Sequence, residues 1–479
     1  MRQTAQLLPA THSPTLAAKQ PPDGASGRWS SIHGDPKITT SFAAARRGPS
    51  FEFLTGFEGT YIFGSGLDVL QTTEHTTRYE TDLQMLAADG IRSFRCCIPW
   101  HHIEATRGSY DWTWLDGYLE AVRALGLEPI ADPLHHTSFP DWLEGGFADP
   151  DFEEAYLAFL GAFATRYPWI RRYTIINEPL VTAWFCGHCG IWQPKLHGHG
   201  NFVPMVLAVC RTLVRASHML DEILGRAEFL HVDSCERHHG LDEASLAHAW
   251  FENERRFLVV DLILGKVDAD HPLRGYLLEH GASADALDGF LERPTRIDIL
   301  GLDYYSHSEL AWRDGGAVRA LVHPVQGFAA TALEYVKRYG LPVMLSETNL
   351  RGSVEDRVSW LRYMVAECEA LCATLEPLGV PFLGFCWYPY IDSTDWTSLV
   401  REARRSIDPQ GICSLGRNFD RRRSALSEIY ARLVAGGLAA AELPAFPFSE
   451  EALEERWVRN FLPHMTWAAP VSADLSLTA

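Results

Sequence analysis

The sequence contains no uninterrupted apolar run of the roughly 18 residues that a membrane-spanning helix requires. Basic residues are also scarce, because 42 Lys and Arg stand against 61 Asp and Glu, a formal net charge of −19. Such a chain offers no electrostatic surface for nucleic acid or for an acidic membrane. We therefore expect neither as a partner. A neutral or cationic ligand fits this charge better, although the acidic excess would also serve solubility alone.

Two further signals are absent. The ten cysteines are not preceded by a charged-then-apolar secretory leader, so they do not predict a disulfide scaffold. We therefore predict that the chain resides in a reducing compartment, and we expect a cytoplasmic location. No Gly-rich phosphate-binding fingerprint follows the first apolar run, which makes a pair of doubly wound domains the weaker alternative for the fold.

The middle of the chain alternates short apolar or β-branched runs with amphipathic segments of helical period. At 47% apolar residues, the 479-residue chain can bury a large core. Eight strand-then-helix units that close on themselves form a (β/α)8 TIM barrel, an α/β fold. We predict this barrel over residues 51–436. The eight predicted strands are residues 51–57, 91–100, 127–135, 172–178, 227–234, 298–305, 341–347 and 381–388.

The two ends of the chain differ in composition from this middle. Residues 1–50 are rich in Ser, Thr, Pro, Ala and Gly and predict a flexible leader. Residues 437–479 predict a Gly/Ala linker, a short acidic helix and a proline-bounded tail. The aromatic residues of the tail are expected to dock on the barrel or on a second subunit, so a homo-oligomer is an open alternative.

In a TIM barrel the carboxyl ends of the strands carry the active site, because every βα loop opens on that face. Glu178, in "RRYTIINEPL", ends the fourth predicted strand, and Glu347, in "LSETN", ends the seventh. Two carboxyl groups that face each other are what glycosidic bond cleavage requires. The alternative for either glutamate alone is a strand-end residue that forms a salt bridge with a loop.

At this point the sequence resembles glycoside hydrolase family 1 and its relatives in clan A. The resemblance rests on Asn177, Glu178 and Pro179 after the fourth strand and on Glu347 after the seventh. It extends through "FRCCIPWHHIEATRGSYDWTWLDGYLEAVRALGLEPIADPLHHTSFPDWL", "LGLDYYSH" and "WYPYIDSTDW" and covers roughly residues 51–436. The implied substrate is a carbohydrate or glycoside, with no cofactor and no metal ion.

The resemblance implies a role for each matching residue. Glu178 would be the general acid/base and Glu347 the nucleophile, with their carboxyl groups about 5 to 5.5 Å apart and retention of configuration. Arg95 and Tyr305 would hydrogen-bond the nucleophile, while Asn177 would bind the 2-hydroxyl of the sugar. The implied sugar-binding histidine is His136, four residues before Pro140.

Other positions depart from the family pattern, which predicts a divergent member. Glu58, in "TGFEGT", is a candidate replacement for a glutamine that the family usually carries, or else a surface loop residue. Asp395 and Trp396 stand where a glutamate and a tryptophan usually grip the outer sugar hydroxyls, and Trp387 ends the eighth strand. Trp184 and Trp192 are candidate sugar-stacking platforms, or ordinary loop-packing residues.

Two alternatives concern chemistry. The density of Cys and His in "FCGHCGIWQPKLHGHG" could suit zinc, but its position in the loop after Asn-Glu-Pro favours no metal. The expected function is that of a retaining β-glycosidase acting by double displacement. A catalytically silent sugar-binding barrel and a transglycosylase, in which an acceptor hydroxyl replaces water, remain open alternatives.

Overall fold

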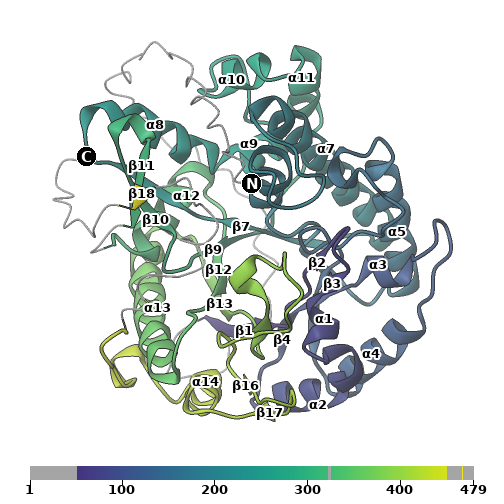
Figure 1. Cartoon of the computed structure of the whole chain (residues 1–479), viewed down its shortest axis with the longest axis vertical. Helices are drawn as coiled ribbons and strands as arrows, with labels where there is room; N and C mark the ends of the chain where they lie inside the picture. Colours follow the sequence, from purple (N-terminus) through teal and green to yellow (C-terminus); the bar gives the residue numbers. More distant parts are fainter. Residues whose placement is uncertain (1–50, 322–324, 450–451, 453–465, 468–479) are drawn as a thin grey trace, which may run out of the picture. The chain divides into compact units, whose positions relative to one another are not determined.

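The computed structural model describes residues 51–321, 325–449, 452 and 466–467, all within one compact unit, Arg46–Ala479. The predicted leader and most of the predicted tail lie outside the described residues. Eight strands form a closed parallel barrel in the order β1-β13-β12-β9-β7-β6-β5-β4 (Figure 1). The predicted (β/α)8 barrel is therefore confirmed. The barrel strands are β1 (Glu52–Gly56), β4 (Ser93–Cys97), β5 (Glu128–Asp132), β6 (Arg172–Tyr173), β7 (Glu228–Ser234), β9 (Ile299–Asp303), β12 (Val343–Thr348) and β13 (Phe382–Trp387).

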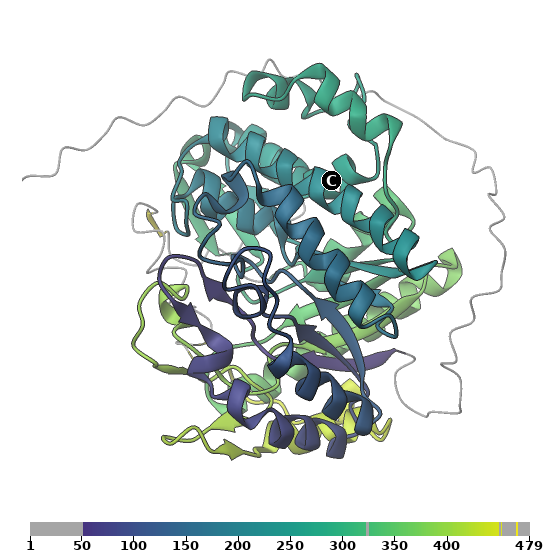
Figure 2. The same cartoon turned by 90° about the vertical axis from the view of Figure 1, so that its right-hand side faces the viewer.

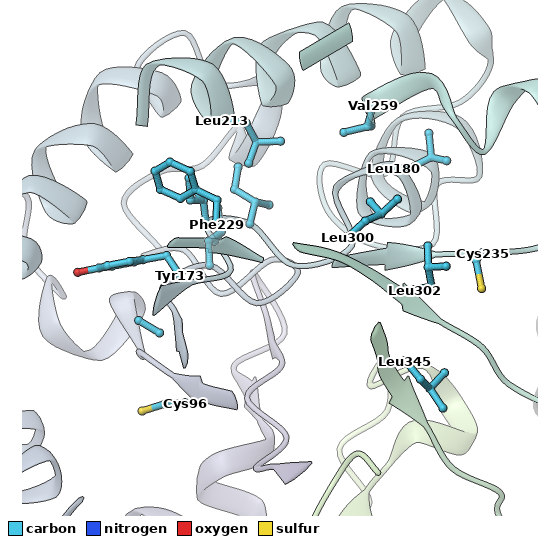
Figure 3. Close-up of a cluster of buried hydrophobic side chains, with 14 of the residues drawn as sticks. Cys96, Tyr173, Leu180, Leu213, Phe229, Cys235, Val259, Leu300, Leu302 and Leu345 are labelled. Atoms are coloured by element: carbon cyan, nitrogen blue, oxygen red, sulfur yellow. The ribbon is translucent and has the colours of Figure 1, made fainter. Parts of the chain in front are cut away.

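Helices surround the barrel in both views (Figures 1 and 2). Every residue of β4, β9 and β12 is buried, as expected for strands covered on both faces. Figure 3 shows side chains of these strands, such as Leu300 and Leu345, with Leu213 and Val259 of the helical layer. The helices are α1 (Val69–Thr72), α2 (His75–Ala88), α3 (Trp100–Ile103), α4 (Thr113–Ala124), α5 (Phe152–Arg166), α6 (Pro179–Ala183), α7 (His199–Leu224), α8 (Glu243–Arg255), α9 (Leu258–Ile263), α10 (Arg274–Glu279), α11 (Ala284–Glu292), α12 (Phe328–Tyr339), α13 (Val354–Leu375) and α14 (Ala425–Val434).

Helix α7 is long and apolar enough to cross a bilayer, with a mean hydropathy of 1.3 in its most apolar window. Its length is explained by packing, since 67% of that window is buried inside the protein. Arg211 and Arg215 interrupt its apolar sequence and form ion pairs with Glu153 of α5. α7 therefore belongs to the helical layer over the barrel.

The fourth barrel strand is shorter than predicted. β6 pairs over only two residues, and Asn177 continues the ladder through isolated bridges to His135 and Val232. The chain turns at Glu178, whose φ of 41° lies in the left-handed region. Pro179 then starts α6, where its missing N–H costs no helical hydrogen bond. The turn brings Glu178 to the mouth of the barrel.

Short strands outside the barrel were not predicted. Four of them form one sheet in the order β18-β11-β10-β8, built from segments that follow β7 and β9 and from residues 466–467. The strands outside the barrel are β2 (Tyr61–Ile62), β3 (Leu67–Asp68), β8 (Arg237–Gly240), β10 (Glu309–Arg313), β11 (Val318–Leu321), β14 (Ser393–Thr394), β15 (Ile407–Asp408), β16 (Ser414–Leu415), β17 (Arg421–Arg422) and β18 (Thr466–Trp467).

The C-terminal elements close the barrel at its seam. Tyr430 of α14 donates a hydrogen bond to the carbonyl of Leu54 in β1, and Arg421 of β17 forms a buried ion pair with Asp82 of α2. In both views the yellow-green segment around α14 lies near the purple α2 (Figures 1 and 2). Residues from the two ends of the barrel sequence thus hold β1 and β13 together.

Candidate active site

Glu347 lies near the end of β12 with its side chain 5% exposed. The Tyr305 hydroxyl donates to Oε2 of Glu347 at 2.6 Å, and Nη1 of Arg95 donates to Oε1. Both contacts expected of Arg95 and Tyr305 are therefore present in the structure. They satisfy the charge of this carboxylate and fix its orientation.

Arg95 is fully buried in β4 and distributes its guanidinium among three partners. Besides Glu347, its Nη2 donates to Asp132 Oδ2 at 2.7 Å and to Asn177 Oδ1 at 2.6 Å. A buried guanidinium requires such partners, because an unpaired one costs several kcal/mol. Asn177 is also fully buried, and its Nδ2 has no hydrogen-bond partner among the described residues.

Glu178 occupies a contrasting environment. Its side chain is 12% exposed, and the nearest cationic candidate, Nε2 of His136, is 3.7 Å from its Oε2. Burial raises the pKa of Glu178 well above its ordinary value, and the charges of Glu347 and Asp233 raise it further. Burial and the proximity of His135 and Arg95 lower the pKa of His136 well below its ordinary value, so this imidazole is neutral. These effects favour the protonated form of Glu178.

Both glutamates line one cavity of about 300 Å³. Its walls come from the loops after several barrel strands, as the carboxyl-end position of TIM-barrel sites requires. The lining combines aromatic faces with a small set of polar groups, which is typical of pockets for small ligands. Of the predicted ligand residues, those that line the cavity are Glu58, His136, Trp184, Trp192 and Trp396.

Comparisons with known proteins bear on this site. The family model Glyco_hydro_42, described as β-galactosidase, matches residues 71–152. β-Glucosidase 42 of Arabidopsis thaliana is 24% identical over 192 residues, 38% of each chain, and β-galactosidase BgaH of Haloferax lucentense is 31% identical over 104 residues, 21% of this chain and 14% of its own. Over part of its length, the chain is similar to glycoside hydrolases of clan A.

Solved structures agree at the level of the fold. The family 1 β-glucosidase of Thermotoga maritima superposes with a TM-score of 0.67 at 16% identity, over 82% of this chain and 99% of that one. The matched sequence regions span less than two fifths of the length of the curated relatives. The solved structures therefore show the barrel fold, and the sequence matches show a similarity to glycoside hydrolases over part of the chain.

Three predicted ligand residues are not among those that line the cavity: Asn177, which is fully buried beside Arg95, Trp387 and Asp395. Trp387 is fully buried, and its Nε1 donates to the carbonyl of Gln410 at 2.9 Å. The carboxylate of Asp395 accepts backbone N–H groups of Arg405 and Ser406 at 2.8 and 2.9 Å. The carboxylate of Asp395 therefore stabilises the conformation of its own loop. Trp396, the next residue in this loop, lines the cavity.

Glu58 belongs to a buried charged network, which excludes the surface-loop alternative. Its Oε1 accepts the Thr60 hydroxyl at 2.7 Å and lies 3.2 Å from Nε2 of His135. The other nitrogen of His135, Nδ1, lies 2.7 Å from Asp132 Oδ2. Although burial alone would raise the pKa of Glu58, its bond to His135 lowers it. The network continues through Asp132 to Arg95, so it links Glu58 to Glu347.

Asp132 and His135 were not predicted as site residues. Asp132 could have been recognised from the sequence, because it is a carboxylate inside the apolar run "LEPIADPLH", where an unpaired charge is costly. His135 is buried between the carboxylates of Glu58 and Asp132. In the register of β4 and β5, Asp132 lies opposite Cys97 and its side chain reaches the guanidinium of Arg95.

A second group of unpredicted residues lines the cavity from α8 and the outer sheet. Arg255 stacks on Trp184, with its guanidinium carbon 3.8 Å from a ring centroid, and pairs with Glu252. His238 accepts the Trp312 Nε1–H at 3.0 Å through Nδ1 and lies 3.4 Å from Glu236 through Nε2. The segment "CERHHG" thus contributes to the cavity wall through β8. The position of β8 depends on its pairing with β10, which is distant in the sequence.

The loop considered for zinc does not gather its ligands. Within the described residues, Cys186, Cys189, His188 and His197 are not among the groups whose donor atoms converge as a metal site requires. His188 instead stacks on Trp184 at a centroid distance of 3.7 Å. Converging donors occur at two other places, around Asp132 in the network described above and around Asp68.

Proposed function

We propose that this chain hydrolyses a β-glycosidic bond with retention of anomeric configuration. One observation carries the proposal: two glutamates in opposite electrostatic settings line one cavity. Glu347 receives hydrogen bonds from Arg95 and Tyr305, whereas Glu178 holds a proton because its pKa is raised. A nucleophilic carboxylate and a protonated carboxyl group are the pair that double displacement needs.

In the first step, Glu347 attacks the anomeric carbon while Glu178 protonates the leaving oxygen. The bond to the leaving group breaks as an ester bond to Glu347 forms, so the negative charge of Glu347 is lost. That charge is one of the causes that raise the pKa of Glu178, so its removal lowers this pKa. Glu178 can then accept a proton from water, which attacks the anomeric carbon and frees Glu347.

The sugar that is transferred would lie among Glu58, His136, Trp192 and Trp396, which line the cavity together with the two catalytic residues. Asn177 is fully buried and is not among the lining residues, but its unpartnered Nδ2 would donate to the 2-hydroxyl of a sugar that reaches it, an interaction that strengthens in the transition state. Neutral His136 can donate or accept at the sugar hydroxyls. These contacts make an uncharged, hydroxyl-rich ring the fitting substrate.

The leaving group would lie on the side of Trp184 and α8. Glu236, Glu252 and Arg255 line that side, and their charges are already paired within the protein. Hydroxyl groups can join such pairs as donors and acceptors at once, whereas a purely apolar leaving group would only desolvate them. A second sugar unit is therefore the class of leaving group that this wall fits best.

The test is a panel of aryl β-glycosides assayed with the wild type, Glu178→Ala and Glu347→Ala. We expect Glu178→Ala to keep cleaving substrates with activated leaving groups, because these need no protonation. Glu347→Ala should be inactive until azide or formate supplies a replacement nucleophile. Equal activity of all three proteins would refute the assignment, and a wild type that binds sugars without cleaving any glycoside would favour the silent barrel.

A further inference from the structure

We propose that Asp68, His101 and His102 bind a Zn²⁺ ion at the rim of the barrel, separate from the catalytic cavity. Asp68 ends β3, and the two histidines lie in α3, which follows β4. None of the three lines the cavity described above. The donor set of two imidazoles and one carboxylate is typical of zinc in proteins.

The donor atoms converge on one point. Nε2 of His101 lies 2.9 Å and Nε2 of His102 lies 2.8 Å from the same oxygen, Oδ2 of Asp68. The other oxygen, Oδ1, accepts the N–H of Gln71 and so caps α1. The carboxylate is therefore oriented by the helix while Oδ2 remains directed at both imidazoles.

A candidate fourth donor lies beside His102. The side-chain amide of Gln71 lies 2.7 Å from Nε2 of His102. Turning that amide by 180° exchanges its nitrogen for its oxygen, which would complete a tetrahedron with the three other donors. In the arrangement described, two imidazole nitrogens contact one carboxylate oxygen, and the Gln71 amide contacts one of those imidazoles.

The site is preorganised but accessible. Asp68 and His101 are nine-tenths buried or more, and the His101 ring stacks on Tyr61 at 4.1 Å. The side chain of His102 is 33% exposed and offers an entry path. Ligand distances near 2.1 Å separate neighbouring donors by roughly 3.4 Å, so the donors must move apart by about 0.5 Å. Rotation of His102 can supply the movement at its own position, and His101 must move away from Asp68 by a similar distance.

Zinc at this position would be structural. It would tie the segment that leads into α1 to α3, two segments that the barrel brings together from different βα loops. α1 in turn contacts the loop of Trp396, because the hydroxyls of Thr72 and Thr394 lie 2.6 Å apart. The ion would thus stabilise one edge of the cavity without taking part in the reaction.

The experiment uses tag-free full-length protein, stripped with EDTA, dialysed and titrated with ZnCl₂ by calorimetry. We expect one Zn²⁺ per chain and a higher Tm in its presence. His102→Ala should weaken binding at least tenfold and remove the increase in Tm, while the Tm without zinc stays near that of the wild type. Asp68→Asn, which can still cap α1, should have the same effect on binding.

The matched control is His197→Ala, in the Cys- and His-rich loop, which should bind zinc as the wild type does. The proposal would be overturned if the stripped protein binds no zinc, or if His102→Ala and Asp68→Asn bind it unchanged. Loss of binding in His197→Ala alone would assign zinc to that loop instead. Each readout is independent of glycosidase activity.

Discussion

At the scale of single residues, the two glutamates differ through their neighbours. Glu347 has Arg95 and Tyr305 as donors, while the proton of Glu178 is held in place by burial and by two nearby carboxylates. One of these is Asp233, whose carboxylate accepts the N–H of Leu180 at the start of α6. Burial raises the pKa of Asp233 to about 7. Asp233 therefore gains its charge in the range where the proton of Glu178 matters.

The first prediction concerns this neighbour. Asp233→Asn removes a negative charge that raises the pKa of Glu178, so that pKa should fall. The alkaline limb of kcat/KM, which reports loss of the Glu178 proton, should move to lower pH. The measurement is a pH profile on an aryl glycoside with a poor leaving group. Asp268→Asn, at an exposed position, serves as the control, and an unshifted limb in Asp233→Asn would contradict this account.

The second prediction concerns the support of the nucleophile. Tyr305→Phe removes the 2.6 Å hydrogen bond to Oε2 of Glu347, so kcat should fall roughly 100-fold, as for loss of one preorganised donor. The Tm should change little. Tyr304→Phe is the matched control, because its hydroxyl bonds Glu309 outside the cavity. That variant should lose stability and retain kcat, and the opposite pattern would rule out the proposed role of Tyr305.

Functional residues could be predicted from the sequence where they directly follow a strand. Glu178, Glu347 and Tyr305 stand at or just after strand ends, where recognised strands place them at one face of the barrel. Arg95 lies in the middle of β4, and its role came from the family resemblance. Asp395 could not be placed in this way, because its partners are backbone groups of its own loop. Loop conformation of this kind leaves no periodic signal in the sequence.

At the scale of elements, the predicted strands overlap the eight observed ones, and their lengths differ. β6 was predicted over seven residues and pairs over two, because the chain bends at residues 175 and 176 and rejoins the ladder only at Asn177. The outer sheet was missed for another reason. β8 and β10 are parallel and have 68 residues between them, so no local turn marks their pairing, whereas β10 and β11 form a local antiparallel pair joined by residues 314–317.

A third prediction tests α8 as a wall for the leaving group. Glu252→Gln removes the charge that pairs with Arg255 in the cavity lining. For a β-disaccharide that the wild type cleaves, kcat/KM should fall about tenfold, equal to about 1.4 kcal/mol. An aryl glycoside of the same sugar should be cleaved almost as before. Glu254→Gln is the control, since Glu254 pairs with Arg338 instead of lining the cavity, and equal losses on both substrates would exclude this role.

At the scale of the whole molecule, stability depends on closure of the barrel. Asp82 of α2 and Arg421 of β17 form two hydrogen bonds of 2.6 and 2.8 Å across the seam, and His75 adds a third contact to Asp82. The pair is buried, so removing one partner leaves an uncompensated charge. This contact joins segments that are 339 positions apart in the chain.

The fourth prediction follows from this pair. Asp82→Asn should lower the free energy of unfolding by about 3 kcal/mol at pH 7, measured by urea denaturation. Burial alone would raise the pKa of Asp82, but its bonds to Arg421 and His75 lower it. A lowered pKa stabilises the fold above the unfolded-state pKa of about 4, so the difference between wild type and variant should shrink as the pH falls below that value.

The control for this prediction is Asp116→Asn. Asp116 also forms two bonds with an arginine, Arg166, but both side chains are more than two fifths exposed. Exposed pairs contribute about 1 kcal/mol or less. If Asp116→Asn lowered the free energy of unfolding as much as Asp82→Asn does, the effect of Asp82→Asn could not be attributed to loss of the buried pair at the seam.

The central claim is that Glu347 forms a covalent bond to the sugar. The most direct measurement is mass spectrometry of the protein after reaction with a 2-deoxy-2-fluoro β-glycoside that carries an activated leaving group, of the same sugar as a cleaved substrate. We predict an increase of one fluoroglycosyl mass, carried by the peptide that contains Glu347, in the wild type and not in Glu347→Ala. A label on another residue, or turnover of the substrate with no label, would contradict the account.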